Sequence, residues 1–241
     1  MKTGVQQLFN SKEGFYQSVN EEYALDMTPS HKEYLETMKK HTMTFGIGPP
    51  GTGKTLLATK YALDQLKANK VKKIIITRPH VEVGYKMGHL PGLVEEKVAP
   101  YLQPIYDAMN EIDDPELVRK FIDEGKIQVE PVAFVRGKTF HESVILIDEA
   151  QNLTKVECLT LFTRIGKKSQ IIVTGDLNQM DIKPSHSGLM DSINRLHLCE
   201  KVGVHEFSSA DIKRCDFVKD VIEKYELSED KIEKYEFKKS K

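Results

Sequence analysis

Apolar positions along the chain fall into short, unbroken runs that alternate with longer stretches of helical spacing. Four runs, each bounded by turn residues, are typical of strands buried in a parallel sheet: 43–47, 73–77, 144–147 and 170–174. Helical spacing, with start signals at Asp114-Pro115 and Leu153-Thr154, predicts helices over 54–68, about 93–110, 115–123, 155–164 and 187–197. This order predicts an α/β fold, a single domain with a mostly parallel sheet and helices on both faces.

A glycine-rich loop follows the first of these strands and leads into the first predicted helix. Its glycines let the backbone turn N–H groups toward the α- and β-phosphates of a nucleotide, and the helix adds its positive dipole end. The lysine near its end can reach the β- and γ-phosphates, and the final threonine hydroxyl can bind Mg²⁺. The residues expected to bind the nucleotide are Gly48, Pro49, Pro50, Gly51, Thr52, Gly53, Lys54 and Thr55.

An acidic pair, Asp148 and Glu149, ends the 144–147 strand. Asp148 is expected to hold the same Mg²⁺ as Thr55, and Glu149 to polarise the attacking water. Ligands of wound α/β sheets bind beyond the carboxyl ends of the strands, so the loop, this pair and Asp176 should meet at one edge. The combination indicates hydrolysis of a nucleoside triphosphate.

Composition agrees with one folded domain. A chain of 241 residues with 39% hydrophobic residues can bury a large single core. No apolar run approaches the roughly 18 residues of a membrane span, and the first residues lack the hydrophobic stretch of a signal peptide. We therefore expect a cytoplasmic protein without membrane contact. The three cysteines, odd in number and without metal-ligand spacing, are expected to be reduced and mostly buried: Cys158, Cys199 and Cys215.

Charge does not identify a partner. The formal net charge is −1, which gives no general attraction to nucleic acid but leaves room for a local basic groove. Arg78, at the end of the 73–77 strand, can reach a nucleic-acid phosphate or pair with a local carboxylate, and spacing does not choose between these. Gln179 follows the 170–174 strand and is expected to touch the γ-phosphate and the catalytic water. The alternative is that Gly175-Asp176 serves only as a cap or turn.

Several long segments in a fixed order carry a more specific signal: 45–55, 77–84, 90–106, 134–139, 146–152, 161–166, 173–176 and 211–214. On these segments the chain, over residues 28–226, resembles the PhoH family of phosphate-starvation-inducible ATPases, which are related to the RecA-like core of superfamily 1 helicases. The resemblance implies a P-loop NTPase domain that binds and hydrolyses ATP. It also implies a ring-like homo-oligomer, with a hexamer as one option, that acts on RNA or single-stranded DNA. Residues 1–27 are then an N-terminal arm and 227–241 a charged tail.

Two positions depart from the family pattern. The family places a glutamine that reads the adenine edge in a segment like Gln-Lys-x-Tyr, and the matching residue here is His31. His31 is expected either to hydrogen-bond the base or to be a surface histidine ahead of a helix. Pro50 stands where the family usually has alanine and removes one N–H donor from the loop, although nucleotide binding is expected to survive.

A single RecA-like domain cannot form a two-lobed helicase cleft within one chain, so the cleft is expected between subunits. A neighbour would then supply an arginine to the γ-phosphate, a device that raises rates by about 10³-fold or more. Arg164 and Arg214 are the first candidates and Arg136 the third, each with a structural ion pair as its alternative role. Arg78 and Arg136 are also expected to follow the nucleic-acid backbone.

The leading hypothesis is therefore an ATP-driven remodeller or translocase on RNA or single-stranded DNA. A nucleotide-switched binding module, which hydrolyses ATP slowly and acts on a protein partner, is the alternative from another class. A small-molecule kinase fits the loop but not a carboxylate directed at water. The residues before the loop are too few for a fused nuclease-like domain, so no nuclease activity is expected.

Overall fold

The computed structural model describes residues 27–79, 103, 105–213 and 221. The predicted arm 1–27, apart from Met27, and the predicted tail 227–241 lie outside the described residues, as do Arg214 and Cys215. Much of the predicted helix 93–110 also lies outside them, and residues 105–112 are helical. The domain boundaries stay predictions.

The described residues build one parallel sheet in the order β3-β2-β4-β5-β1-β6. The four predicted strands are confirmed, with ends that differ by no more than one residue, whereas β3 and β6 are additional edge strands. Their bounds are β1 Met43–Ile47, β2 Lys73–Thr77, β3 Ile127–Val129, β4 Ser143–Ile147, β5 Gln170–Gly175 and β6 Val202–Glu206.

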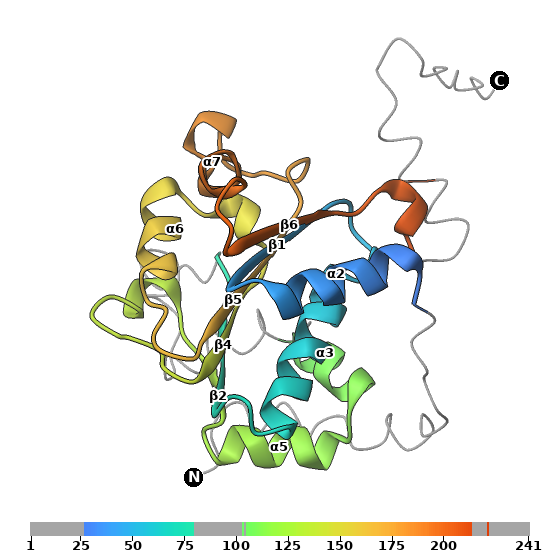
Figure 1. Cartoon of the computed structure of the whole chain (residues 1–241), viewed down its shortest axis with the longest axis vertical. Coiled ribbons are helices and arrows are strands. Elements are labelled where there is room, and N and C mark those ends of the chain that lie inside the picture. The colour runs from blue at the N-terminus through green and yellow to red at the C-terminus, as the bar shows by residue number, and fades with distance from the viewer. Residues whose placement is uncertain (1–26, 80–102, 104, 214–220, 222–241) are drawn as a thin grey trace, which may run out of the picture.

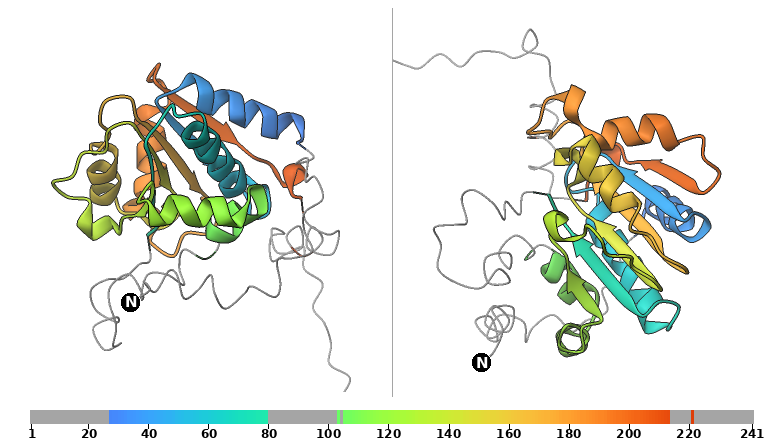
Figure 2. Two further views of the ribbon diagram at one scale, coloured as in Figure 1. Left: turned by 90° about the horizontal axis from the view of Figure 1, so that it is seen from below. Right: turned by 90° about the vertical axis from the view of Figure 1, so that its left-hand side faces the viewer.

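Helices cover both faces of this sheet (Figure 1, Figure 2). On one face lie α2 (Pro29–Lys40) against β1 and β6, α3 (Lys54–Lys67) against β2, β4 and β5, and α5 (Pro115–Asp123) against β3. On the other face lie α6 (Lys155–Phe162) and α7 (Gly188–Leu196). Alternate residues of each inner strand point to opposite faces of the sheet, and each face has its own hydrophobic core. Ile74 and Ile76 belong to the core beneath α3, and Ile75 belongs to the core on the opposite face. Short 3₁₀ turns are η2 Val132–Phe134, η3 Ala150–Asn152, η4 Pro184–His186 and η5 Ser209–Asp211. This three-layer arrangement is the RecA-like P-loop NTPase fold.

The helix starts follow their capping residues. The Asp114 side chain accepts from the N–H of Glu116 with Pro115 in the first turn, and Thr154 forms a capping box with Glu157. By contrast α3 begins at Gly53, whose φ is 80°, and no described side chain caps it. The first N–H groups of α3 are thus left for a ligand.

No helix in the described ranges has the length and apolarity needed to cross a bilayer. Of the two cysteines described, Cys158 is buried as expected. Cys199 is exposed, because it lies in the turn that connects α7 to the edge strand β6. With Cys215 outside the described residues, the expectation that the three thiols are mostly buried stays a prediction.

Candidate nucleotide-binding site

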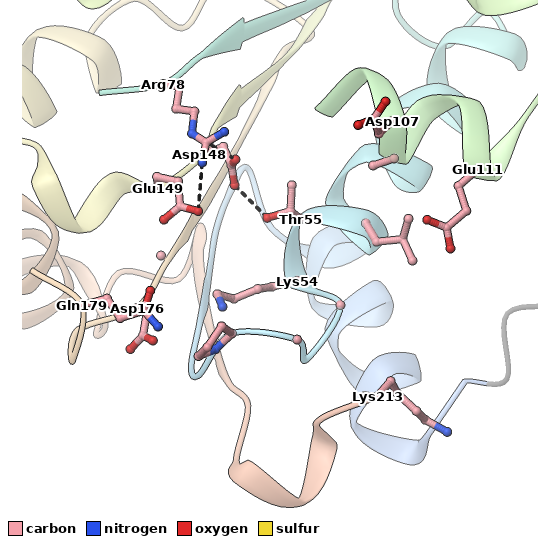
Figure 3. A pocket seen from close by; sticks show the side chains of 16 residues that line it. Lys54, Thr55, Arg78, Asp107, Glu111, Asp148, Glu149, Asp176, Gln179 and Lys213 are labelled. Atoms are coloured by element: carbon pink, nitrogen blue, oxygen red, sulfur yellow. Dashed lines mark hydrogen bonds and ion pairs between the residues drawn. The ribbon is translucent and has the colours of Figure 1, made fainter. Parts of the chain in front are cut away.

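A cavity of about 520 Å³ opens at the carboxyl edge of the sheet (Figure 3). Its walls come from the glycine-rich loop, from the residues that follow β2, β4 and β5, and from the 105–112 helix. The structure therefore brings together the loop, the acidic pair, Asp176 and Gln179, as predicted for an edge where parallel strands end.

The loop depends on glycine at its two ends. Gly48 has a φ of 142°, and a Cβ there would lie 2.5 Å from the carbonyl oxygen of Phe207. Gly53 is in the left-handed region at 80°, where it turns the chain into α3. Larger residues would therefore either clash with the neighbouring chain or strain the turn that aims the helix at the cavity.

Lys54 lies across the loop. Its ammonium group donates to the carbonyl oxygen of Pro49 over 2.9 Å, and the Thr52 hydroxyl donates to the same oxygen over 3.0 Å. Partial burial lowers the pKa of Lys54, while the nearby carboxylates of Asp176 and Glu149 act in the opposite direction. A cation is thus held at the centre of an acidic cavity.

Asp148 is the most enclosed acid of the site, with 2% of its surface exposed. Its Oδ1 accepts from the Thr55 hydroxyl over 2.8 Å and from the Thr174 hydroxyl over 2.6 Å. Burial raises the pKa of Asp148, and the neighbouring Glu149 charge raises it further. A bound cation would relieve both costs.

The residues present fit Mg²⁺. Thr55 and Asp148 place a hydroxyl and a carboxylate oxygen side by side, and Mg²⁺ takes one or two such protein oxygens together with water and phosphate oxygens. The part of the chain that the structure describes has no group of three or more His, Cys, Asp or Glu side chains arranged to hold a metal. The remaining ligands would therefore come from the nucleotide and from water.

Glu149 is held by one partner on each carboxylate oxygen. Its Oε1 accepts from Arg78 Nη2 over 3.2 Å, and its Oε2 accepts from Gln151 Nε2 over 2.6 Å. The backbone of Glu149 has a φ of 56°, a left-handed conformation that costs a non-glycine residue about 1 kcal/mol or more. Backbone strain of this kind is typical of functional sites, where it fixes the direction of a side chain.

Of the two roles expected for Arg78, the structure shows the pairing with local carboxylates. Besides Glu149, its Nε lies 3.8 Å from Asp148 Oδ2. Both partners follow β4, the strand that pairs with β2. Because the sequence does not show which strand lies next to β2, it could not decide between the two roles of Arg78.

Gln151 is a site residue that sequence reasoning missed. Its Nε2 donates to Glu149, and its Oε1 accepts from the backbone N–H of Asp176 over 3.1 Å. It fits beside Gly175, where a Cβ would lie 3.0 Å from Oε1. This buried amide therefore connects the ends of β4 and β5. The available signal was its place in the segment Asp-Glu-Ala-Gln, two residues after Glu149.

Asp176 makes the turn that was its alternative role. Its Oδ1 accepts from the N–H of Asn178 over 2.9 Å, and its carbonyl oxygen accepts from the N–H of Gln179 over 3.1 Å. Both Asp176 and Gln179 still line the cavity. The turn is thus what presents Gln179 to the site, so the two interpretations are not exclusive.

Three further charged residues line the cavity without having been predicted: Asp107, Glu111 and Lys213 (Figure 3). The first two lie one turn apart on the 105–112 helix. Lys213 follows η5, and its backbone N–H donates to the carbonyl oxygen of Gly51 over 2.9 Å. Its segment, 211–214, was noted only for the family resemblance.

His31 lies within α2 and is 5% exposed, so the expectation of a surface histidine ahead of a helix is wrong. Its Nδ1 accepts from the N–H of Thr28 over 3.2 Å, which assigns the proton to Nε2. Nε2 donates to the carbonyl oxygen of Thr52 over 2.9 Å. Both ring nitrogens are therefore engaged, Nδ1 at the start of α2 and Nε2 on the loop.

Of the arginines expected to act on a neighbouring subunit, Arg164 and Arg136 do not line this cavity. Arg164 donates to the carbonyl oxygens of Thr160 and Lys138 over 3.2 and 3.3 Å, at the end of α6. Arg136 is exposed after η2 and lines a second cavity of about 570 Å³, which shares Arg78 with the first. A role in trans stays a prediction for each, and Arg214 lies outside the described residues.

Comparison with known proteins identifies relatives that match most of this chain. The chain is 40% identical over 199 residues to a PhoH-like protein of Mycobacterium tuberculosis (82% of this chain, 56% of the relative). It is 40% identical over 200 residues to a PhoH-like protein of Bacillus subtilis (83% and 63%) and 33% identical over 195 residues to Protein PhoH of Escherichia coli K12 (80% and 55%). This chain thus spans between about half and two thirds of these relatives.

Among solved structures, the Pif1 helicase of Candida albicans aligns at 15% identity with a TM-score of 0.40, covering 76% of this chain and 40% of that one. A second solved structure, an isolated ATPase domain, aligns at 15% identity with a TM-score of 0.31, covering 71% and 68%. A family model described as PhoH-like protein matches residues 25–226. With that match and the identities above, the chain belongs to the PhoH-like protein family.

Proposed function

We propose that this protein hydrolyses ATP in the cavity of about 520 Å³ and couples hydrolysis to binding of RNA or single-stranded DNA as a homo-oligomer. The observation that carries the proposal is the position of Glu149. Its carboxylate lies in the same cavity as Lys54, Thr55 and Asp148, and the Gln151 amide holds it there. A directed carboxylate beside a phosphate-binding loop supports hydrolysis over phosphoryl transfer to an organic acceptor.

Each residue has a distinct task in this proposal. The N–H groups at the start of α3 bind the phosphates, and Lys54 exchanges its Pro49 partner for the β- and γ-phosphates. Glu149 orients the attacking water and accepts its proton. Mg²⁺, when bound by Thr55 and Asp148, neutralises phosphate charge. Gln179 contacts the γ-phosphate end of the nucleotide. The preference for ATP over other nucleotides follows from family membership alone.

The second cavity is the proposed nucleic-acid site. It offers two guanidinium groups, Arg78 and Arg136, to phosphates. Its apolar wall, which suits the face of an unstacked base, consists of Pro79, Val132, Ala133 and Ile182. Because the net charge of the chain is −1, such a local site must supply the attraction that the whole molecule lacks.

The fold gives a physical reason for the proposed oligomerisation. One RecA-like domain provides a single wall to the nucleotide, and an arginine from a neighbouring subunit would complete the charge stabilisation of the transition state. Arg164, Arg214 and Arg136 stay the proposed donors. A ring such as a hexamer places every site at a subunit boundary.

Steady-state ATPase of the purified protein, with and without single-stranded RNA and DNA at two salt concentrations, tests the proposal. Stimulation by polymer that disappears in Glu149→Gln is the expected result. ATP hydrolysis that ignores every polymer would contradict the coupling and favour a nucleotide-switched module acting on a protein partner. A phosphorylated organic product would instead favour a kinase.

A further inference from the structure

Arg78 lies between the two cavities and contributes to the wall of both. It follows β2, and its guanidinium reaches Glu149 Oε1 over 3.2 Å and Asp148 Oδ2 over 3.8 Å (Figure 3). No other residue is shared by these two cavities in the described part of the chain. A ligand in the second cavity therefore meets the same side chain that holds the proposed catalytic carboxylate.

The two bonds to Glu149 differ in how easily they break. Gln151 is buried, and its amide is fixed at both ends, by Glu149 and by the N–H of Asp176. Arg78 is 21% exposed and the Glu149 side chain 38% exposed, so water and solutes reach this ion pair. Partly exposed ion pairs are weak, whereas arginine binds phosphate with two parallel, charge-assisted hydrogen bonds. A phosphodiester can thus compete with Glu149 for Arg78.

The pairing also limits what Glu149 can do. Each carboxylate oxygen can accept two hydrogen bonds, so these two bonds do not exclude water, but together they fix the direction in which the carboxylate points. Loss of the arginine bond frees Oε1, while the Gln151 bond keeps the carboxylate in the cavity.

The remaining walls of the second cavity suit an incoming phosphate. Arg136 provides a second, exposed guanidinium. Glu157 is the acidic residue of the lining, and its carboxylate already accepts from the N–H and hydroxyl of Thr154 over 2.8 and 2.7 Å. Its charge is therefore placed at the start of α6, where the helix dipole stabilises it.

We propose that Arg78 restrains Glu149 until a phosphodiester in the second cavity competes for its guanidinium. Polymer binding then raises the hydrolysis rate by releasing Glu149 Oε1 toward water. This inference rests on the proposed function, because it takes Glu149 as the group that polarises water. It adds a regulatory role for one residue and a physical route between the two cavities.

The test compares wild type, Arg78→Gln and Arg195→Gln without and with saturating single-stranded RNA. Arg78→Gln is expected to raise kcat without polymer severalfold, toward the stimulated wild-type rate, and to lose further stimulation. Arg195 pairs with Asp191 on the surface of α7, so Arg195→Gln is the matched control and should behave as wild type. A kcat of Arg78→Gln without polymer that is unchanged or reduced would overturn the restraint.

Two additional variants keep this test separate from that of the proposed function. Arg78→Gln combined with Glu149→Gln must be as inactive as Glu149→Gln alone; activity in the double variant would overturn both proposals. If no polymer stimulates wild type, the nucleic-acid coupling fails, and the rate of Arg78→Gln still decides the restraint. Arg78→Lys, which keeps the charge but not the two-pronged geometry, should give a smaller rise in kcat and serves if Arg78→Gln does not fold.

Discussion

Gln151 donates a hydrogen bond of 2.6 Å to Glu149 and accepts one from the backbone N–H of Asp176, so one buried amide sets the direction of the proposed catalytic carboxylate. We predict that Gln151→Leu, which keeps the volume but neither bond, lowers kcat by up to about 10²-fold and changes the KM for ATP little. Phosphate release measured over a range of ATP concentrations separates the two effects. Gln128→Leu, on β3 far along the sheet from β5, is the control. Equal losses in kcat and ATP affinity would argue for a structural role only.

Glu149 and Lys54 line the same cavity, but we predict that replacing Glu149 impairs hydrolysis and replacing Lys54 impairs ATP binding. Glu149→Gln keeps the shape and should bind ATP normally while kcat falls by about 10²-fold or more, because only the proton acceptor is lost. Lys54→Ala should lose ATP affinity, because the loop then lacks its cation. Binding of a fluorescent ATP analogue, measured beside phosphate release, distinguishes them. Normal turnover in Glu149→Gln would assign the acceptor to another residue.

His31 holds the loop through Thr52 with both ring nitrogens engaged. We therefore predict that His31→Ala raises KM for ATP and for GTP by the same factor, because it loosens the loop that binds the phosphates of both. Competition between the two nucleotides in one assay gives the ratio directly. A ratio that shifts toward GTP would show that His31 reads the adenine after all.

Tyr34 is 0% exposed, and its hydroxyl has no hydrogen-bond partner among the described residues. Burial raises the pKa of Tyr34 far above its ordinary value, because it disfavours the phenolate, so the hydroxyl stays neutral. Tyr34→Phe is predicted to leave the free energy of unfolding unchanged or to raise it by up to about 1 kcal/mol.

The contrast is Tyr61, whose hydroxyl donates to Gln170 Oε1 over 2.9 Å. Tyr61→Phe should lower the free energy of unfolding by about 1 kcal/mol, because it leaves that amide oxygen without its donor. Urea unfolding of both variants provides the comparison. A loss in Tyr34→Phe as large as in Tyr61→Phe would mean that the Tyr34 hydroxyl has a partner.

His205 packs against Tyr34 and Phe207, with its Nε2 3.0 Å from the Ser30 hydroxyl. Burial lowers the pKa of His205; Glu33 and Asp211 oppose the shift, and His31 adds to it. The unfolded chain therefore binds this proton more tightly, so the contribution to stability is present above about pH 6.5 and is lost as pH falls toward the folded value.

We accordingly predict that the free energy of unfolding falls between about pH 7.5 and pH 5.5, and falls less in His205→Gln. His186→Gln, on an exposed turn, is the matched control and should keep the wild-type dependence. Urea titrations at several pH values give the slopes. Identical slopes for wild type and His205→Gln would assign the pH dependence to other groups.

The elements predicted correctly from the sequence are those whose residues follow a clear local pattern. The inner strands have uninterrupted apolar residues because both of their faces are buried, and a run such as 144–147 has no other common explanation. Strand β6, Val-Gly-Val-His-Glu, was missed because among the described strands it pairs with β1 alone and leaves part of its side chains exposed. Strand β3 has only three residues, too few for a pattern.

The site was predictable where its chemistry is contiguous in sequence, as in the loop and the acidic pair. Gln151 and Lys213 were not identified, because their roles depend on which backbone groups the fold brings to them. Arg78 was identified, but the sequence left its partner open, because Asp148 and Glu149 follow the neighbouring strand β4.

The phosphate-binding loop contacts the chain that leaves β6 at its start and in its middle. Phe207 donates its N–H to Ile47 over 2.8 Å and lies so close to Gly48 that no Cβ fits, while Lys213 donates to Gly51. A loop that rearranges around phosphates must therefore carry residues 207–213 with it. Such a movement would reach the edge of the sheet, because this segment follows the edge strand β6.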